Sequence, residues 1–525
     1  MKMVKSLILG SAAALVAVGG AQAADLPVKA KAVEYVKVCS LYGPGFYYIP
    51  GTDTCIKLGG YLRVDVLANA NIDAIGNYAG AGAANNRFTN GYTWRSREDL
   101  NIDTRTATEY GVVRTFFDAT FNWTSDSYGA TGTGSTVYSQ LGSGTTSFSA
   151  PNNANGGAVA AGTVGVYYAF IQFAGFTIGK AVSQFAAPWA AYPGNGFDGL
   201  VGGISTITGV NQFSYTAQFG NGVSLSLSAQ DQTAYMQGGV NNLGATGAGG
   251  AVLGLLGPYG AGDYAGTIAP DLIASLRVDQ AWGLFQASFA AHNNHAAYYG
   301  GTELTGHPDD KWGWAGALAL SIKNIPTGPG DTINIQGVYT NGATRYNISE
   351  LSLAGANTIY GGTNLPGAYQ SIGFGVAPDS VFINGGSQQL VTTYGFRGAY
   401  VHNWNPYWNT SIYGAWAQVN YNSTAKGYIC GPAGNGVGGS FGAVFGTAGL
   451  TSCNPDYSFA QLGTQTQWTP VKNLTFSADF TYAHLDQNYA GTITTASAGI
   501  GKPAAVYELK NQDTYQLLLR AQRNW

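Results

Sequence analysis

The chain has 525 residues, of which 10% are charged and 45% are hydrophobic by a wide definition, and its formal net charge is −3. Globular domains usually carry roughly 25% charged residues, so uncharged polar side chains supply most of the polarity here. The hydrophobic fraction is too high for a disordered chain, and the charge is too balanced for a nucleic-acid-binding protein. Glycine (77) and tyrosine (34) are abundant while methionine (3), glutamate and lysine are scarce, which predicts an all-β protein rather than an α or α/β enzyme.

The first two dozen residues have the pattern of a secretory signal peptide. Lys2 and Lys5 precede an apolar stretch over 7–18, and Ala21-Gln22-Ala23 has the small residues of a cleavage site. The apolar stretch is shorter than the roughly 20 residues that a membrane helix needs. We therefore expect a signal peptide over 1–23 and a mature chain that is exported. Since no later segment resembles a spanning helix, the mature protein is predicted to be either soluble outside the cytoplasm or a β-barrel.

Four cysteines fit an oxidising compartment. Cys39 lies close in sequence to Cys55, as Cys430 does to Cys453, so local pairing is the natural expectation, although three connectivities are formally possible. The sequence has no Cys-x-x-Cys spacing, so neither a zinc site nor a redox site is expected.

From Lys57 onwards, apolar and polar residues alternate in segments of about ten residues, after an irregular lead-in over 24–56. Within 57–68, Leu58, Leu62 and Val64 share one face, while Arg63 and Asp65 share the other. The same alternation occurs over 92–106, 110–123, 213–219, 223–230, 333–339 and 474–482. This period of two predicts β-strands throughout residues 57–525.

The connections between these strands alternate between short and long. Tight turns are expected at 174–175, 220–222, 282–283 and 406–407, and long loops rich in small and polar residues at 125–160, 231–270, 343–391 and 421–455. A large soluble β-sandwich or β-helix would also alternate, but it has no reason to place all the long loops on one side. Even strand numbers, short periplasmic turns, long external loops and aromatic strand ends are typical of outer-membrane barrels. We predict a transmembrane antiparallel β-barrel of about 16 strands, with tryptophans at the strand ends (Trp94, Trp123, Trp312, Trp314, Trp404, Trp408, Trp468 and Trp525).

Three segments resemble a known family. Residues 34–65 contain Glu-Tyr-Val-Lys-Val-Cys and Gly-Thr-Asp-Thr-Cys-Ile-Lys-Leu-Gly-Gly-Tyr-Leu-Arg-Val-Asp, residues 105–111 read Arg-Thr-Ala-Thr-Glu-Tyr-Gly, and the chain ends in Arg-Ala-Gln-Arg-Asn-Trp. These segments resemble the alphaproteobacterial general porins of Brucella and rhizobial outer membranes, although family members usually end in Phe and this chain ends in Trp525. The resemblance implies a homotrimer of 16-stranded barrels, each a water-filled channel narrowed by an inward-folded third loop.

The residues that would control passage are charged residues on the lumen face. A barrel of 16 strands leaves an aqueous channel, and its selectivity depends on the charges at the narrowest zone. The third external loop is expected over 186–210, after a strand over 176–185, and its only acid is Asp198. The alternation assigns to the lumen wall Arg63, Arg95, Arg97, Arg105 and Arg114, together with Asp65, Asp99, Asp103 and Asp118.

Two interpretations of this wall remain open from the sequence. Arginines facing the Asp198 carboxylate would set up a transverse field across the pore; alternatively, the wall is an ordinary polar lining in which Arg and Asp neutralise one another. Glu98 does not fit the alternation of apolar and polar faces, because this charged residue falls on the apolar, outward face with Leu100. It would lie at a subunit contact, beyond the apolar band, or beside a bulge.

We therefore expect a passive, non-enzymatic porin for ions and small hydrophilic solutes, with no cofactor and no bound metal. Its expected surroundings are outer-membrane lipid and lipopolysaccharide, and its expected assembly is a homotrimer. His292 and His295 fall on opposite strand faces, and His307 with Asp309 and Asp310 reads as solvated loop charge. The alternatives are a substrate-specific channel, for example for sugars, and a secreted or surface adhesin-like β protein.

Overall fold

The computed structural model describes residues 37–68, 92–124, 163–189, 200–204, 206, 208–232, 236–244, 261–262, 264–348, 357–434, 437–495 and 503–525. The chain divides between Ile56 and Lys57 into two compact units. The predicted signal peptide over 1–23 and the predicted loop residue Asp198 lie outside the described residues.

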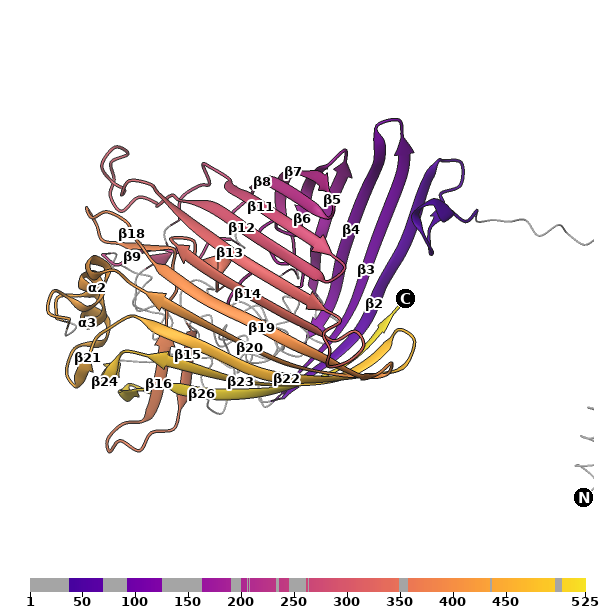
Figure 1. Cartoon of the computed structure of the whole chain (residues 1–525). Helices are drawn as coiled ribbons and strands as arrows, with labels where there is room; N and C mark the ends of the chain where they lie inside the picture. Colours follow the sequence, from indigo (N-terminus) through magenta and orange to yellow (C-terminus); the bar gives the residue numbers. More distant parts are fainter. Residues whose placement is uncertain are drawn as a thin grey trace, which may run out of the picture. The chain divides into compact units, whose positions relative to one another are not determined.

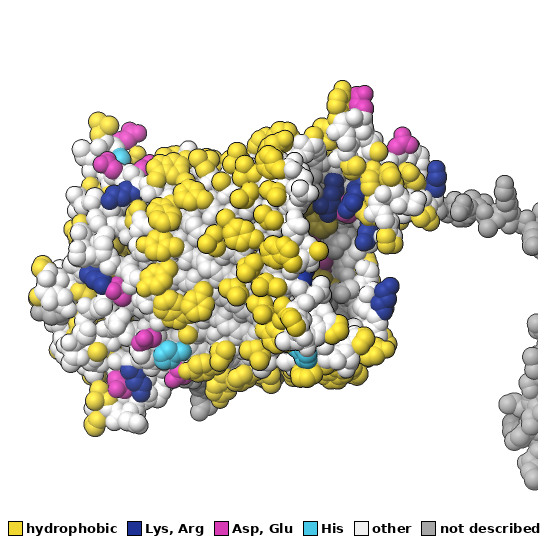
Figure 2. Space-filling view, viewed as in Figure 1, with side chains coloured by type: hydrophobic (Ala, Val, Ile, Leu, Met, Phe, Trp, Pro, Cys, Tyr) yellow, Lys and Arg dark blue, Asp and Glu magenta, His cyan; other side chains and the backbone are white. Residues whose placement is uncertain are grey.

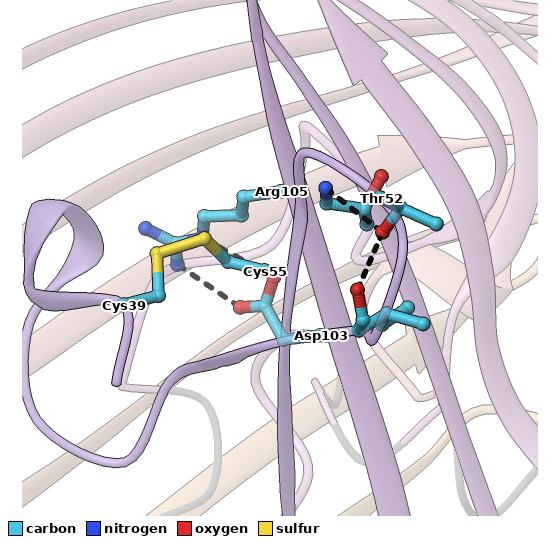
Figure 3. Close-up of a disulfide and its surroundings, with 7 residues drawn as sticks. Cys39, Thr52, Cys55, Asp103 and Arg105 are labelled. Carbon is cyan, nitrogen blue, oxygen red and sulfur yellow. Dashed lines mark hydrogen bonds and ion pairs between the residues drawn. A yellow bond between two sulfur atoms is a disulfide. The ribbon is translucent and has the colours of Figure 1, made fainter. Parts of the chain in front are cut away.

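The described part of the first unit is a small disulfide-linked fold. It contains η1 (Ser40–Tyr42) and β1 (Tyr47–Tyr48), and β1 pairs with the start of β2 (Thr54–Ala68). Cys39 and Cys55 form a disulfide with a Cα–Cα distance of 6.0 Å (Figure 3). Both cysteines are buried and pack against Phe46, so the disulfide takes the place of a larger core in this short segment.

The second unit is a closed antiparallel barrel of 16 strands, in which strands that follow one another along the wall are hydrogen-bonded neighbours (Figure 1). The last strand pairs with β2, from Tyr61 opposite Asn524 to Ala68 opposite Leu517, and thereby closes the barrel. Closure leaves no unpaired sheet edge, as a β-structure in lipid requires. After β2, the wall strands are β3 (Tyr92–Thr108), β4 (Gly111–Thr124), β5 (Thr163–Phe173), β6 (Phe176–Ala181), β7 (Val210–Gly220), β8 (Val223–Gln230), β11 (Asp271–Gln280), β12 (Gly283–Asn294), β13 (Lys311–Lys323), β14 (Thr332–Asn341), β19 (Thr392–Asn405), β20 (Trp408–Asn420), β22 (Tyr457–Val471), β23 (Leu474–Gln487) and β26 (Gln512–Asn524).

The predicted alternation of short and long connections is present. Two-residue turns join β5 to β6 and β7 to β8, and at each turn both central residues have positive φ: Ala174 and Gly175, and Asn221 and Gly222. Such turns match the right-handed twist of the two strands that they join. The short turns lie at one end of the barrel, together with the C-terminus, and the described parts of the long connections lie at the other end.

The outer face of the barrel is apolar. Leu62, Phe213, Leu318 and Leu462 each expose more than half of their surface there, and Figure 2 shows hydrophobic side chains over the face of β11 to β20, with charged side chains mainly toward the strand ends. Trp94, Trp312, Trp404, Trp408 and Trp468 are exposed near strand ends, as in the aromatic girdles of membrane barrels. Among the described residues, the helices are too short or too polar to cross a bilayer.

The long connections carry structure of their own. A four-stranded sheet joins β9 (Val240–Asn242), β10 (Ala261–Gly262), β17 (Ser380–Phe382) and β18 (Gln389–Leu390), and a five-stranded sheet joins β15 (Asn357–Gly361), β16 (Gln370–Gly375), β21 (Leu450–Ser452), β24 (Ala490–Thr495) and β25 (Ala505–Leu509). Among the described residues of these connections, three short helices accompany the sheets: η6 (Thr344–Tyr346), α2 (Ser423–Cys430) and α3 (Ser440–Phe445). Phe374, Phe441, Phe445 and Tyr489 are buried together, so this end of the barrel has its own apolar core.

Candidate functional site

Strand register brings the predicted charged residues onto one wall of the lumen. Between β3 and β4, Arg97 lies opposite Asn122, Asn101 opposite Asp118, and Arg105 opposite Arg114. Alternate residues of the same strands, such as Phe117 and Phe121, are exposed on the outer face, because successive side chains of a strand point to opposite faces. We use the name arginine wall for these charged lumen residues of β2, β3, β4 and β26: Arg63, Arg95, Arg97, Arg105, Arg114 and Arg520, with Asp65, Asp99, Asp103 and Asp118.

Asp65 lies between two arginines of this wall. Its carboxylate accepts hydrogen bonds from Arg95 (Nη2–Oδ2, 2.5 Å) and Arg520 (Nε–Oδ1, 2.6 Å). The Asp65 side chain has no exposed surface, and Arg63 donates to Gln522 at 2.8 Å beside it. The buried carboxylate thus fixes two guanidinium groups and joins the first strand of the barrel to the last.

Asp103 holds a second pair of arginines. Arg105 (Nη2) and Arg114 (Nη2) each lie 3.0 Å from its Oδ2 atom, and Figure 3 includes the Asp103–Arg105 pair. Arg114 also donates to Gln172 at 2.9 Å, and its guanidinium lies 5.1 Å from the centroid of the Phe116 ring. Both arginines keep 29% of their side-chain surface exposed, so they remain accessible to solvent.

The remaining members are held mainly by neutral groups. Arg97 donates to Asn122 Oδ1 at 2.5 Å and lies 5.4 Å from the Tyr167 ring centroid. Asn101 donates to Asp99 at 3.5 Å, while Asp118 Oδ1 is buried without a hydrogen-bond partner among the described residues. In total, the arginine wall contains six arginines and four aspartates.

Glu98 lies on the outward face, as the sequence pattern indicated. It lies opposite Phe121, and β3 pairs with β4 through this region without a register shift. The shift in this part of the wall lies between β4 and β5, at Asp118 and Ala119. A bulge in the β3–β4 pairing therefore does not account for the position of Glu98.

The described parts of the third long connection (182–189, 200–204, 206 and 208–209) fold into the lumen. The strand before it ends at Ala181 rather than at Phe185, so the predicted strand over 176–185 is four residues too long. The amide of Gln212 donates to the carbonyl oxygens of Ala181 and Val182 (2.8 and 2.9 Å) at the point where the chain leaves the wall. Phe185 is then buried against Tyr346, with ring centroids 4.6 Å apart, because an apolar ring at this position finds a core inside the barrel.

Residues 200–204 of this connection dock onto the far side of the barrel. Arg397 of β19 is almost fully buried and donates to the carbonyl oxygens of Leu200 (3.3 Å) and Ile204 (2.7 Å), and to Gln336 of β14 (3.0 Å). We call this contact the Arg397 anchor. Since the connection starts between β6 and β7 and reaches β14 and β19, it crosses the lumen.

Backbone geometry makes this docking tight. The N–H groups of Gly202 and Gly203 both donate to the carbonyl oxygen of Asn347 (2.9 and 3.1 Å). Gly202 has φ +87°, and a Cβ atom there would lie 2.5 Å from the Phe396 carbonyl carbon. Only glycine permits this approach.

A second part of the lumen wall is almost free of charge. We use the name neutral wall for Thr216 and Gln218 of β7, Ser224 and Ser226 of β8, Ser275 of β11, and Gln286 of β12. Hydroxyl pairs link the strands: Thr216 to Ser226 at 2.8 Å, and Ser275 to Ser288 at 3.3 Å. Arg277 and Asp279, which continue this wall along β11, bind each other at 2.7 Å.

The other candidate residues have structural contacts. Cys430 and Cys453 form a disulfide that joins the end of α2 to the segment after β21, and the chain-entropy model assigns about 3 kcal/mol to a closure of this size. His295 pairs with Asp310 at 2.7 Å, and His307 Nδ1 lies 3.0 Å from the carbonyl oxygen of Pro308. No group of three or more potential ligands is arranged for a metal ion in the part of the chain that is described.

A buried polar cluster joins two long connections to the rim of the barrel. His292 lies 2.8 Å from Asp271 and 3.6 Å from Asp379, and Tyr264 donates to Asp379 at 2.6 Å. Burial by itself would raise the pKa of the Asp379 carboxyl, but the contacts with His292, Tyr264 and the Gly238 N–H hold that pKa below its ordinary value. The charged carboxylate is therefore a structural tie between these loops.

Sequence reasoning missed Arg397, Arg520 and the neutral wall. Arg520 follows the outward residues Leu517 and Leu519, and Arg397 follows the outward residue Phe396. The alternation of side chains along the strand could therefore have placed both arginines on the lumen face. The contact of Arg397 with residues 200–204 had no such signal, because these residues are almost 200 positions apart.

Comparison with known proteins agrees with this architecture. A family model described as the porin subfamily matches residues 25–518. Porin Omp2b of Brucella suis biovar 1 is 36% identical over 247 residues, which are 46% of this chain and 57% of that protein; the Omp2b of Brucella melitensis biotype 1 is 35% identical with the same coverage. The chain thus matches a little over half of the length of these relatives.

A solved structure shows the same fold. The outer membrane channel DcaP of Acinetobacter baumannii superimposes with a TM-score of 0.52 at 15% sequence identity, over 91% of this chain and 99% of that one. The family model and this fold identify the molecule as a Gram-negative outer-membrane β-barrel. The chain belongs to the porin subfamily.

Proposed function

We propose that this chain is a passive diffusion channel for ions and small hydrophilic solutes, with no chemical step, cofactor or energy input. The observation that carries the proposal is the third connection, which starts between β6 and β7 and whose residues 200–204 are bound to the opposite wall by Arg397. A 16-stranded barrel is wide enough for water, and an inward loop narrows it to a size at which wall charges act on passing solutes.

The narrow zone of this channel is proposed to lie between the third connection and the arginine wall. At least two of Arg63, Arg95, Arg97 and Arg114 line it in this proposal, with Asp198 on the opposing loop. Asp65 holds Arg95 in place, and Asp103 holds Arg114. Arg105, Asp99 and Asp118 complete the charged lining in this proposal, and the open surface of Arg105 and Arg114 supports their access to ions.

Assembly as a homotrimer within lipid and lipopolysaccharide is part of the same proposal. The position of Glu98 supports a protein contact on the outer face of β3, since a carboxylate facing hydrocarbon is costly. In this proposal, Glu98 lies against a neighbouring copy of the chain rather than against lipid.

Planar-bilayer recording of the detergent-purified, folded protein under a KCl gradient tests the proposal. We expect large ohmic current steps that close in thirds at high voltage, with a reversal potential that reports the ion preference. Folded, membrane-inserted protein that gives no channels would overturn the diffusion function. Channels that close in a single step would overturn the trimer alone.

A further inference from the structure

The lumen contains a polar cavity of about 630 Å³ between the neutral wall and the third connection. This volume lies within the roughly 300–1,000 Å³ of small-molecule sites. Its floor is the neutral wall, and its other side is formed by the start of the third connection, including Ser183, Gln184 and Ala186. The cavity is separate from the arginine wall, because no residue of that wall is among the described residues that line it.

The floor is built from two adjacent rows of side chains. In the first row, Ser226 of β8 lies between Thr216 of β7 and Ser275 of β11. In the second row, Ser224 lies between Gln218 and Arg277 of the same two neighbouring strands. Gln218 is exposed and Ser224 is half-buried, so both are accessible from the lumen. The result is a flat array of hydroxyl and amide groups with regular spacing.

The opposite side of the cavity is held rigidly. Gln286 donates to the carbonyl oxygen of Ala186 at 3.0 Å, and Ser183 donates to Gln230 at 2.8 Å. Tyr168 closes the rim, where its hydroxyl donates to the carbonyl oxygen of Thr206. Because the protein's own groups make these contacts, binding would require little ordering of the protein.

Charge complementarity points to a neutral ligand. Among the described residues that line the cavity, the charged side chains are Arg277 and Asp279, and they bind each other at 2.7 Å. Hydroxyl and amide groups both donate and accept hydrogen bonds, as sugar hydroxyls do. An anion would find better partners on the arginine wall, and an apolar solute would leave the polar groups of the cavity unpaired.

We propose that this cavity is a binding site for a neutral, polyhydroxylated solute of sugar size, which delays such solutes on their way through the channel. The site includes Thr216, Gln218, Ser224, Ser226 and Gln286, and Tyr168 provides an apolar ring at its edge. This inference rests on the proposed channel function and adds a substrate class to it.

Sucrose serves as the probe, in single-channel recordings in KCl. For the natural sequence we expect a saturable reduction of current as sucrose is added, beyond the effect of solution viscosity. The variant Gln218→Leu with Ser224→Ala removes two accessible polar groups that do not hold the third connection. It is expected to raise the half-blocking concentration about tenfold, the effect of losing one or two hydrogen bonds, while the KCl conductance is kept.

The matched control is Gln516→Leu, which removes a buried amide from the lumen face of β26, away from the cavity. Its block by sucrose should equal that of the natural sequence. A current reduction that follows viscosity alone, or the same block in the double variant, would overturn the binding site and leave the channel intact. If no current appears even in KCl, it is the proposed function that fails.

Discussion

The arginine wall and the neutral wall face the same lumen and arise from the same alternation of side chains. They differ in how their polar side chains are paired. On β2 to β4 and β26, arginines are gathered around Asp65 and Asp103. On β7, β8, β11 and β12, hydroxyl and amide groups bind one another. Both solutions leave the outer face apolar.

The difference between the walls lies in what remains for a solute. Two arginines that share one carboxylate keep a net positive charge, which acts over about 8 Å at physiological ionic strength. A network of neutral groups has no long-range field, and it acts only on a solute in contact with it. The first wall is therefore suited to sorting ions, and the second to holding uncharged solutes.

The largest effect is expected from neutralising the arginine wall. Arg97→Gln with Arg114→Gln removes two charges from the proposed narrow zone. A unit charge 4 Å from an ion changes its energy by about 1 kcal/mol in water, or about fivefold in local concentration. The permeability of chloride relative to potassium should fall severalfold, measured as the reversal potential in a KCl gradient. An unchanged reversal potential would place the narrow zone elsewhere.

The second prediction concerns the loop that separates the walls. Arg397→Gln removes a buried guanidinium that holds Leu200 and Ile204, and hydrogen bonds of charged groups contribute about 1.5–3 kcal/mol. We expect a larger and noisier single-channel conductance in the folded variant, because the third connection leaves its position. Arg397→Lys keeps the charge but loses the planar geometry, so it should restore the natural conductance only in part. A variant with the natural conductance would show that the Arg397 anchor does not set the pore width.

A smaller effect tests the neutrality of the second wall. Arg277→Gln with Asp279→Asn removes an exposed ion pair, and such pairs contribute about 0–1 kcal/mol. Because the two charges cancel, the reversal potential should stay within error of the natural value. A clear shift would show that this wall also sorts ions, and the contrast between the walls would be lost.

The smallest effect on conduction is expected at the short-turn end, away from both walls. Burial would raise the pKa of Asp331, but hydrogen bonds from Thr327, the Asn403 N–H and His402 more than offset this and hold its pKa below the ordinary value. A depressed carboxyl pKa stabilises the fold above the unfolded-state value near 4, and this contribution is lost as the pH falls below it.

The variant Asp331→Asn tests the predicted loss of stability as the pH falls. The variant should unfold at a lower temperature than the natural sequence at pH 7, and the difference should shrink between about pH 4 and pH 2. Thermal melting followed by gel migration or circular dichroism measures it. A difference that is constant over this range would show that the carboxylate charge plays no part. Channel conductance at pH 7 should be unchanged.

Much of the fold was predictable because a barrel in a membrane repeats one local rule. Side chains alternate between lipid and lumen, so Leu62 and Arg63 had to face opposite ways. The lengths of the connections then separated one end of the barrel from the other, and the strand number followed from counting them. The disagreement at Phe185 arose because Val182 continues the outward phase of Phe176 and Ile178 in the sequence, while the chain has already turned inward after Ala181.

The sequence by itself determined the strand pattern, the polar lumen and the presence of charged residues such as Arg97 and Arg114 on its wall, because these depend on neighbours along one strand. Only the tertiary structure decided that Asp65 joins Arg95 to Arg520, that Arg397 holds residues 200–204, and that a neutral cavity lies under the third connection. Barrel closure brings together residues 455 positions apart. Contacts of this kind depend on register around the whole barrel, which no local pattern encodes.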